Sequence, residues 1–282
     1  MTAEVTAPGA DEAIALLFEM GATGVEERDD AVLPMPGARK PAPGHALLVA
    51  FFARRAEADE AARALGAGGV AAEVAAIEPR DWGEEWKKGL APLSVGRVFL
   101  RPTWIEAARP PGAVEVVLDP GMAFGTGTHP TTALCLAALD AFLATRPGAA
   151  VLDVGTGSGI LAIAARKLGA GRVAASDDDP VAVLVARENA TRNGAALELT
   201  GADLPAIPGR FDLVVANILA GVLVALAPDL VARLAPGGEL VLAGVLVPQE
   251  SEVRAAFAGA GLAELPGARQ GEWSLLRFRR AA

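Results

Sequence analysis

Short apolar runs alternate with helical patterns over the second half of the chain. Runs typical of buried strands occupy residues 151–154, 172–176, 197–200, 213–216 and 240–242, and a last strand is predicted at 273–278. Apolar residues at helical spacing predict helices at 158–168, 180–192, 219–234 and 249–258. This alternation predicts a mostly parallel sheet with helices on both faces, which binds ligands beyond the carboxyl ends of its strands.

The first 78 residues carry a different pattern and say little about chemistry. Helical spacing predicts helices at 11–20 and 57–65, and apolar or alternating runs predict strands at 46–53 and 70–77. Four prolines between residues 33 and 44 argue against regular structure there. We predict a small α+β domain at 1–78, a linker at 79–93 and a second domain at 94–282. Residues 80–88, rich in charge and tryptophan, are interpreted as part of a helical linker.

Composition narrows the class of protein. With 282 residues, 52% hydrophobic and 21% charged, the chain is too apolar to be disordered and long enough for two domains. Its single cysteine, Cys135, forms no intramolecular disulfide, which fits a reducing compartment. One cysteine and two histidines are too few for a structural zinc site, and nothing in the sequence suggests a metal held by carboxylates, so no metal is predicted.

The charge balance narrows the list of partners. The chain has 25 Lys and Arg against 34 Asp and Glu, a net charge of −9. Direct nucleic-acid binding needs clustered cations and is not expected, whereas a small molecule or a basic protein fits an acidic chain. Residues 1–11 contain no Lys or Arg and do not resemble a signal peptide, and the apolar run 213–228 is too short to span a membrane. We expect a soluble cytoplasmic protein.

A glycine-rich turn follows the first predicted strand of the second domain. Gly155, Gly157 and Gly159 stand where a strand passes into a helix, and Asp153 precedes them by two residues. The dinucleotide fingerprint would require glycine at position 160, which is Ile160. The observed spacing resembles S-adenosylmethionine-dependent methyltransferases instead. A purely structural turn is the alternative.

Acidic residues follow the next two strands. Asp177 lies 22 residues after Gly155, where a carboxylate accepts both hydroxyls of a ribose in nucleoside-binding folds. Asp179 precedes Pro180 and is interpreted as a helix cap. Asp203 follows the third strand; it either accepts from an adenine amino group or is an ordinary loop carboxylate.

Two further segments carry polar groups. Asn217 ends an apolar strand, where amine methyltransferases place an Asn whose carbonyl accepts a hydrogen bond from the target nitrogen; capping of the following helix is the alternative. Residues 119–132 hold three glycines, four threonines and His129 and predict a polar loop. His129 is left out of the predicted catalytic residues, because a loop histidine is more often only a hydrogen-bonding group.

In combination these motifs resemble the PrmA family, the methyltransferases of the eleventh protein of the large ribosomal subunit. The resemblance spans about residues 82–277. It rests on Asp81-Trp82 with Glu85-Trp86, Pro102-Thr103-Trp104, the loop 124–132, Gly155–Gly159, Asp177–Pro180, Asn217–Ala220 and Glu272-Trp273. The sequence departs from the family at Thr156, where many members have Cys, and at Asp178, where an apolar residue is usual.

The resemblance implies a fold and a site. The expected fold is a Rossmann-like class I methyltransferase domain with a seven-stranded, mostly parallel sheet, preceded by a small ferredoxin-like α+β domain that recognises the substrate. The expected cofactor is S-adenosyl-L-methionine and the expected substrate a basic ribosomal protein. The predicted cofactor residues are Thr132, Gly155, Gly157, Gly159, Asp177, Asp203 and Asn217, and Asn217 is the predicted catalytic residue.

The expected chemistry is methyl transfer to lysine side-chain amines, the N-terminal amine, or both. A neutral amine must lie in line with the methyl group, and water suffices to accept the proton. Two other functions stay open at this point. One is a lysine methyltransferase of another protein, and the other is a non-catalytic scaffold that binds S-adenosylmethionine.

Overall fold

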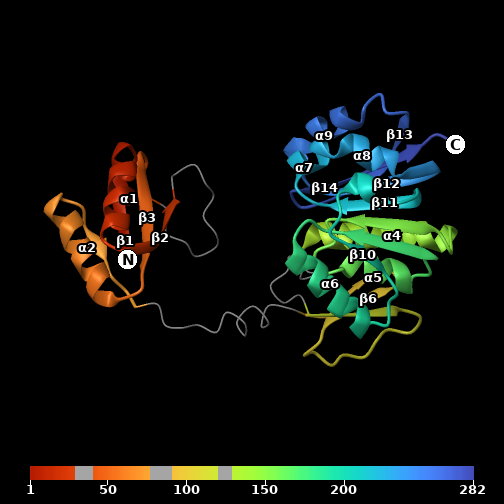
Figure 1. The fold of residues 1–282 in the computed structure, drawn as a ribbon, viewed down its shortest axis with the longest axis horizontal. Helices are drawn as coiled ribbons and strands as arrows, with labels where there is room; N and C mark the ends of the chain where they lie inside the picture. Colours follow the sequence, from red (N-terminus) through yellow and green to blue (C-terminus); the bar gives the residue numbers. More distant parts are fainter. Residues whose placement is uncertain (29–40, 77–90, 120–128) are drawn as a thin grey trace. The chain divides into compact units, whose positions relative to one another are not determined.

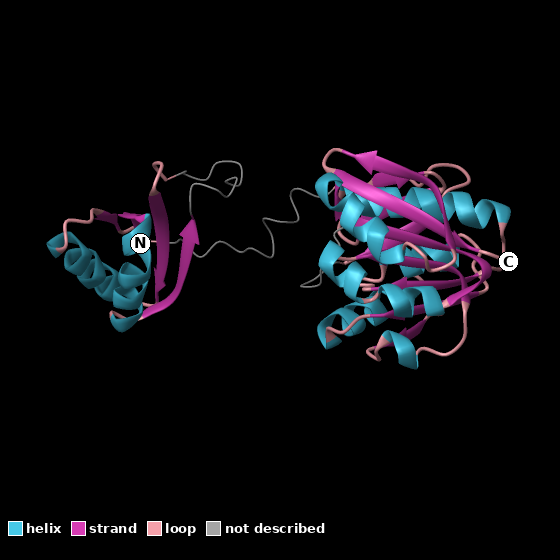
Figure 2. Ribbon diagram, turned by 90° about the horizontal axis from the view of Figure 1, so that it is seen from above, coloured by secondary structure: helices cyan, strands magenta, loops and turns pink. Residues whose placement is uncertain are grey.

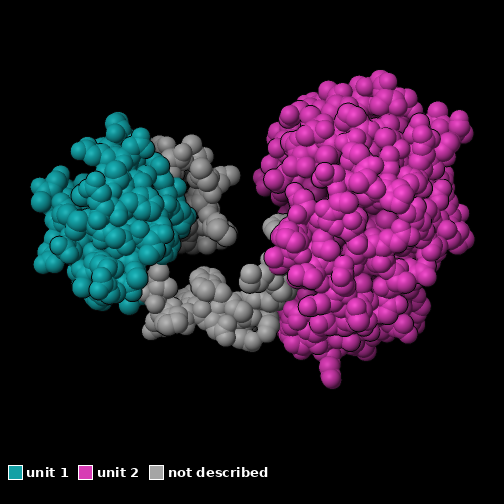
Figure 3. Space-filling model, viewed as in Figure 1, with its two compact units in different colours: residues 1–85 teal, residues 86–282 magenta. Residues whose placement is uncertain are grey.

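The computed structural model describes residues 1–28, 41–76, 91–119 and 129–282 (Figure 1). It divides into two units, Met1–Glu85 and Trp86–Ala282 (Figure 3). The predictions for residues 33–40 of the proline-rich stretch, for the tryptophan-rich segment 80–88 and for residues 120–128 of the polar loop lie outside the described residues. Each unit is described below by itself.

The first unit has the βαββαβ order of a ferredoxin-like domain. Its elements are β1 (Thr2–Thr6), the short helix η1 (Ala7–Gly9), α1 (Ala10–Glu19), β2 (Ala22–Arg28), β3 (His45–Phe52), α2 (Arg55–Ala67) and β4 (Ala72–Glu73). All pairs in the sheet are antiparallel, in the order β2-β3-β1-β4. Leu17 of α1, Leu48 of β3 and Leu65 of α2 share one buried core. The predicted α+β fold is confirmed, although β1 and β2 were not predicted and β4 is shorter than expected.

The second unit is built on a seven-stranded sheet. Its strands are β8 (Ala150–Val154), β9 (Arg172–Ser176), β10 (Glu198–Thr200), β11 (Phe211–Asn217), β12 (Leu234–Leu246), β13 (Leu262–Gln270) and β14 (Trp273–Arg280). The order is β10-β9-β8-β11-β12-β14-β13, and only β14 runs antiparallel to its neighbours. The predicted class I methyltransferase sheet is confirmed, with the order reversing beside β8.

Helices cover both faces of this sheet, as predicted (Figure 2). They are α4 (Pro130–Thr145), α5 (Ile160–Lys167), α6 (Pro180–Arg192), α7 (Ala220–Ala225), α8 (Ala227–Ala232) and α9 (Glu250–Phe257), with the short helices η3 (Leu204–Ala206) and η4 (Val247–Gln249). One buried cluster contains residues of α4 and α5, and the other contains residues of α7, α8 and α9. The single helix predicted at 219–234 is divided in two, because Pro228 stands in the first turn of α8 and has no N–H to donate.

A small second sheet extends this unit and was not predicted. It has the order β5-β6-β7, with β5 (Leu93–Val95), β6 (Val98–Pro102) and β7 (Val114–Leu118). Asn189 of α6 and Asn193, the C-cap of this helix, bind the backbone of the β7 segment: Asn193 bonds Val117, and Asn189 bonds Asp119. These hydrogen bonds attach the small sheet to the C-terminal end of α6, one of the helices that pack on the large sheet.

Cys135 of α4 is fully buried, and burial together with the nearby Asp153 carboxylate raises the pKa of its thiol. Within the described ranges, no three His, Cys, Asp or Glu side chains gather in a way that would hold a metal ion. Over the same ranges, no helix combines the length and apolar character that crossing a bilayer requires.

Glu250, the first residue of α9, fixes the start of β14. Its buried carboxylate accepts hydrogen bonds from Arg269 (2.6 and 2.7 Å), from Arg254 (2.6 Å) and from the Ser274 hydroxyl. These donors, Arg269 foremost, lower the pKa of Glu250 to about 2, although burial opposes the shift.

We expect Glu250 to make stability depend on acid pH. Because its pKa is lower in the folded chain, its contribution is fully present above about pH 4.5 and is lost as the pH falls toward about 2. The urea midpoint should therefore fall from about pH 5 to about pH 3, and less steeply in Glu250→Gln. Glu252→Gln, an exposed control on the same helix, should follow the wild type. Equal slopes in all three proteins would contradict the assignment.

Candidate functional site

The carboxyl ends of four neighbouring strands bring the predicted motifs to one edge of the large sheet. Val154 of β8 pairs with Ser176 of β9 on one side and with Ala216 of β11 on the other. Ser176 in turn pairs with Thr200 of β10. The residues that follow these four positions, the glycine-rich turn, Asp177, Asn217 and the segment leading to Asp203, therefore lie along the same edge.

The glycine-rich turn requires its glycines. Gly155, Gly157 and Gly159 have φ values of 70°, 53° and 83°, in the region that side chains other than glycine rarely adopt. A Cβ on Gly155 would lie 2.2 Å from Ile218 Cγ2, and one on Gly159 would lie 3.2 Å from Ala186 of α6. The turn is thus closely packed between the strand that carries Asn217 and helix α6.

Asp177 is bonded to this turn. Its Oδ2 accepts a hydrogen bond from Gly157 N at 2.8 Å, and its Oδ1 accepts one from Asp179 N at 3.1 Å. A carboxylate has about four acceptor positions, so two remain for hydroxyl groups. Asp179 accepts from Val181 N at 2.8 Å, which confirms its predicted role as the cap of α6.

Asn217 ends β11 opposite Ala243 of β12. It does not cap the next helix: α7 begins at Ala220, its N-cap is Leu219, and no side chain caps it. Among the described residues, the half-buried Asn217 amide has no hydrogen-bond partner. The amide is therefore available for a ligand, and the helix-cap alternative is wrong.

Ile218 fixes the backbone beside Asn217. Its Cγ2 occupies the place where a Cβ on Gly155 would stand, and its carbonyl oxygen would lie 2.2 Å from a Cβ on Gly244 of β12. Gly244 also has a φ of 80°. Ile218 is thus enclosed by two glycines, one in the glycine-rich turn and one on the neighbouring strand.

Thr132 and His129 stand at the start of α4. Thr132 is 3% exposed and donates its N–H to the His129 carbonyl at 3.0 Å. His129 is the N-cap: its Nδ1 accepts from Thr131 N at 3.3 Å and lies 2.7 Å from Thr131 Oγ1. The imidazole packs edge-on against Trp273 with ring centroids 4.6 Å apart. Because Trp273 pairs with Leu246 at the carboxyl end of β12, the start of α4 lies at the same sheet edge.

Asp203 is the predicted site residue that follows the third predicted strand. It is exposed, directly precedes η3, and forms no side-chain cap with that helix. It follows β10, as predicted.

Asp153 lies directly before the glycine-rich turn and was not among the predicted site residues. It is 1% exposed, and its Oδ2 accepts from Thr156 Oγ1 at 2.7 Å and from Ala162 N at 3.2 Å. Its Oδ1 is buried and has no partner within the described residues. Burial raises the pKa of Asp153 to about 6. Its position two residues before Gly155 was the sequence feature that could have identified it.

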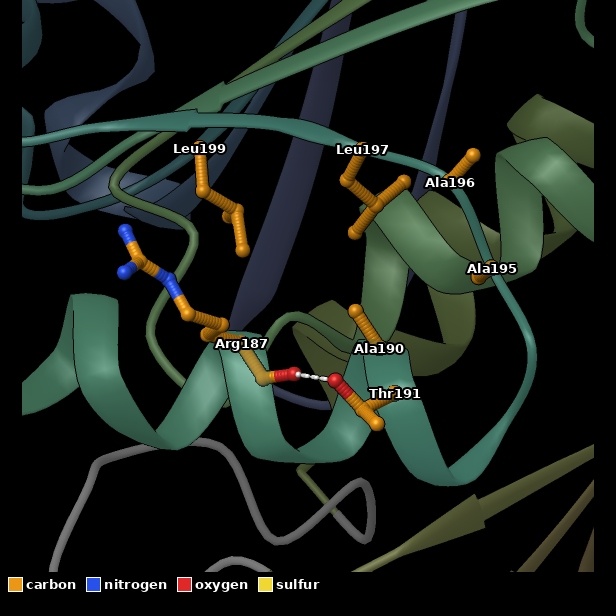
Figure 4. A pocket seen from close by; sticks show the side chains of 7 residues that line it. All are labelled: Arg187, Ala190, Thr191, Ala195, Ala196, Leu197 and Leu199. Carbon is orange, nitrogen blue, oxygen red and sulfur yellow. Dashed lines mark hydrogen bonds between the residues drawn. The ribbon is translucent and has the colours of Figure 1, made fainter.

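One open pocket lies elsewhere in the second unit. Arg187, Ala190 and Thr191 of α6 line one side, and Ala195, Ala196, Leu197 and Leu199 line the other (Figure 4). The Thr191 hydroxyl donates to the Arg187 carbonyl. None of the predicted site residues lines this pocket.

Comparisons with known proteins extend over the whole chain. The sequence model of a family described as "Ribosomal protein L11 methyltransferase (PrmA)" matches residues 1–281. A ribosomal protein L11 methyltransferase of Myxococcus xanthus (strain DK1622) is 47% identical over 283 residues, covering 99% of this chain and 98% of the relative. One from Geobacter metallireducens is 51% identical over 209 residues, covering 73% of this chain and 68% of the relative.

A solved structure shows the same fold. It is titled as a ribosomal protein L11 methylase from Lactobacillus delbrueckii subsp. bulgaricus and superposes with a TM-score of 0.60 at 37% identity. The superposition covers 66% of this chain and 96% of that protein.

Proposed function

The chain belongs to the PrmA family of ribosomal protein L11 methyltransferases, and from that premise we propose that it methylates amines of ribosomal protein L11 with S-adenosyl-L-methionine as the methyl donor. The amines proposed are lysine side chains, the N-terminal amine, or both. The observation that supports this most is the Asn217 amide, which has no partner in the part of the chain that the structure describes and follows a strand beside a turn whose Gly157 is bonded to Asp177.

The residues at the sheet edge fit S-adenosylmethionine. Asp177 is oriented by two backbone N–H groups and keeps acceptor capacity for the two ribose hydroxyls. Asp153 Oδ1 is a buried carboxylate oxygen that no donor of the described segments reaches, which suits a positively charged ligand. We also assign Thr132, Gly155, Gly157, Gly159 and Asp203 to the cofactor site, from the family resemblance and their place at this edge.

Asn217 is proposed to orient the amine. When bound, S-adenosylmethionine supplies a methyl group activated by a positively charged sulfur. The Asn217 carbonyl accepts a hydrogen bond from the incoming nitrogen and so directs its lone pair toward the methyl group. Contact between Ile218 and Gly155 keeps this amide at a fixed place beside the cofactor turn. The contribution of Asn217 is therefore orientation in the transition state.

The amine must lose a proton before transfer. A lysine of ordinary pKa, about 10.4, is neutral in only about one part in a few thousand at pH 7. Partial desolvation and a nearby positive charge both favour its neutral form, and water accepts the proton. His129 is an unsuitable base, because its Nδ1 is the acceptor that caps α4 and burial lowers its pKa.

The first unit is proposed to recognise L11. Residues 1–85 contain 16 acidic and 7 basic residues, whereas residues 86–282 contain 18 of each. The whole net charge of −9 thus belongs to the first unit, which favours a basic protein substrate. No direct contact with nucleic acid is proposed. Since the substrate is a ribosomal protein, we place the enzyme in the cytoplasm.

Mass spectrometry tests the proposed function. Purified chain, L11 and S-adenosylmethionine should yield L11 heavier by multiples of one methyl group, on lysine or N-terminal nitrogen, and no product should form without the cofactor. Methylation of other proteins but not of L11 would favour a different lysine methyltransferase. Cofactor binding without methylation of any protein in a ribosomal fraction would favour the scaffold.

Replacing Asp177 with alanine should weaken S-adenosylmethionine binding about 10–50-fold, because two charge-assisted hydrogen bonds to the ribose are lost. Titration calorimetry measures this directly. Asp178→Ala is the matched control, since Asp178 is the exposed neighbour. Unchanged affinity in Asp177→Ala would remove the ribose assignment.

A further inference from the structure

Asn189 is a fully buried amide in the middle of α6. Its Nδ2 donates to the Ser158 carbonyl at 2.9 Å and to the Asp119 carbonyl at 3.1 Å. Its Oδ1 accepts from Asp119 N at 3.1 Å and from Arg192 Nη1 at 2.5 Å. An amide has two donor and two acceptor positions, and all four are used here. Burial of this polar group is thereby compensated.

The side chain joins three segments that are far apart in the sequence. Ser158 lies within the glycine-rich turn, between Gly157 and Gly159, and Asp119 directly follows β7. Helix α6 also contacts the turn through Ala186, which stands 3.2 Å from where a Cβ on Gly159 would be. Asn189 therefore connects the turn to the small sheet as well as to α6.

The hydrogen bond from Asn189 to the Ser158 carbonyl restrains the backbone of the glycine-rich turn. The peptide unit between Ser158 and Gly159 is planar, so its carbonyl and N–H point in opposite directions. Asn189 Nδ2 holds the carbonyl, and the N–H of Gly159 donates to the Thr156 carbonyl at 2.9 Å. With both ends bonded, this peptide is fixed. The Thr156 carbonyl that it binds belongs to the peptide unit whose N–H, that of Gly157, donates to Asp177 at 2.8 Å.

We propose that Asn189 is a positioning residue for cofactor binding: it fixes the glycine-rich turn in the orientation that presents Gly157 and Asp177 to the ligand. The inference rests on the proposed function only in taking the ligand to be S-adenosylmethionine. Asn189 touches neither the ligand nor the amine. It acts through the backbone of Ser158.

Asn193, one helical turn further along, provides a matched comparison. Its Oδ1 accepts from Val117 N at 2.9 Å, and its Nδ2 donates to the Val117 carbonyl at 2.6 Å. It thus binds the same β7 segment in the same way as Asn189. It has no bond to the glycine-rich turn among the described residues, and it is less buried. The two asparagines thus differ in the hydrogen bond to the Ser158 carbonyl, which Asn189 forms.

The test compares leucine and aspartate at both positions by calorimetry with S-adenosylmethionine. Leucine removes the amide at similar volume, and aspartate keeps the shape and the acceptors but loses both Nδ2 donors. We expect Asn189→Leu and Asn189→Asp to bind the cofactor about tenfold more weakly or worse, and Asn193→Leu and Asn193→Asp to stay within about threefold of wild type. Melting temperatures of all four variants report general destabilisation.

Kinetics supply a second readout. The Asn189 variants should raise the KM for S-adenosylmethionine and leave the KM for L11 unchanged, which a general loss of stability would not do. Near-wild-type affinity in Asn189→Asp, or an equal loss in the Asn193 variants, would overturn the proposal. If Asn189→Leu does not fold, Asn189→Asp decides. Failure of the wild type to methylate L11 would refute the proposed function while leaving the calorimetric comparison intact.

Discussion

Replacing Asn217 with alanine is expected to slow single-turnover methyl transfer to L11 by about a hundredfold or more, with S-adenosylmethionine affinity within about threefold of wild type. The amide lies at the end of β11 and has no partner among the described residues, so its removal leaves no protein group unsatisfied. What is lost is the acceptor that directs the amine. Rapid quench with saturating cofactor measures the rate, and calorimetry on the same preparation measures the affinity.

Two further variants sharpen this experiment. Asn217→Asp keeps an acceptor oxygen but adds a charge that stabilises the ammonium form of the amine, so it should also be slow, and less so at higher pH. Leu219→Ala is the control, because Leu219 is 73% exposed two residues away. Transfer at the normal rate in Asn217→Ala would deprive the proposed mechanism of its substrate-orienting residue.

A chain that begins near Asp81 is expected to bind S-adenosylmethionine within about threefold of the full-length affinity and to methylate L11 at about one hundredth of its rate or less. Every described cofactor-site residue lies in the second unit, whereas the entire net charge of −9 lies in the first. Calorimetry and mass spectrometry measure the two properties. Normal turnover would show that the first unit is not the recognition element.

Salt provides an independent check on the same proposal. If the acidic first unit attracts a basic substrate, the KM of the full-length chain for L11 should rise with ionic strength. The residual activity of the truncated chain should respond less, because residues 81–282 contain 21 acidic and 18 basic residues and so have a net charge of only −3. Circular dichroism of the truncated chain verifies that it is folded.

Local signals were sufficient to predict most of the catalytic fold. The strands that end at Val154 and Ser176 are short, mainly apolar runs, and these two strands and the one that ends at Thr200 are followed at once by glycine or acidic residues. The ends of these strands and the edge they share were therefore predictable. The cap at Asp179 followed from the proline after it. These features depend on a few neighbouring residues, and sequence patterns report such features well.

Features that depend on distant contacts were missed. The sheet β5-β6-β7 and the link from Asn189 to Asp119 join segments many residues apart, and no local pattern indicates them. Asp153 was visible in the motif, but its unpartnered Oδ1 becomes evident only once the surrounding packing is known. The helix-cap alternative for Asn217 was also undecidable from sequence, because it depended on whether α7 begins at Leu219 or one residue later.

Because Ile218 is enclosed between Gly155 and Gly244, we expect the geometry of the proposed reaction to be insensitive to pH and salt. The spacing between the glycine-rich turn and the end of β11 is maintained by steric exclusion between apolar and backbone atoms, without a charged group in the contact. A contact of this kind has no titratable group, and dissolved ions do not screen it. Acidity and salt can therefore alter how well L11 is captured or how much of its amine is neutral, while the alignment of donor and acceptor stays constant.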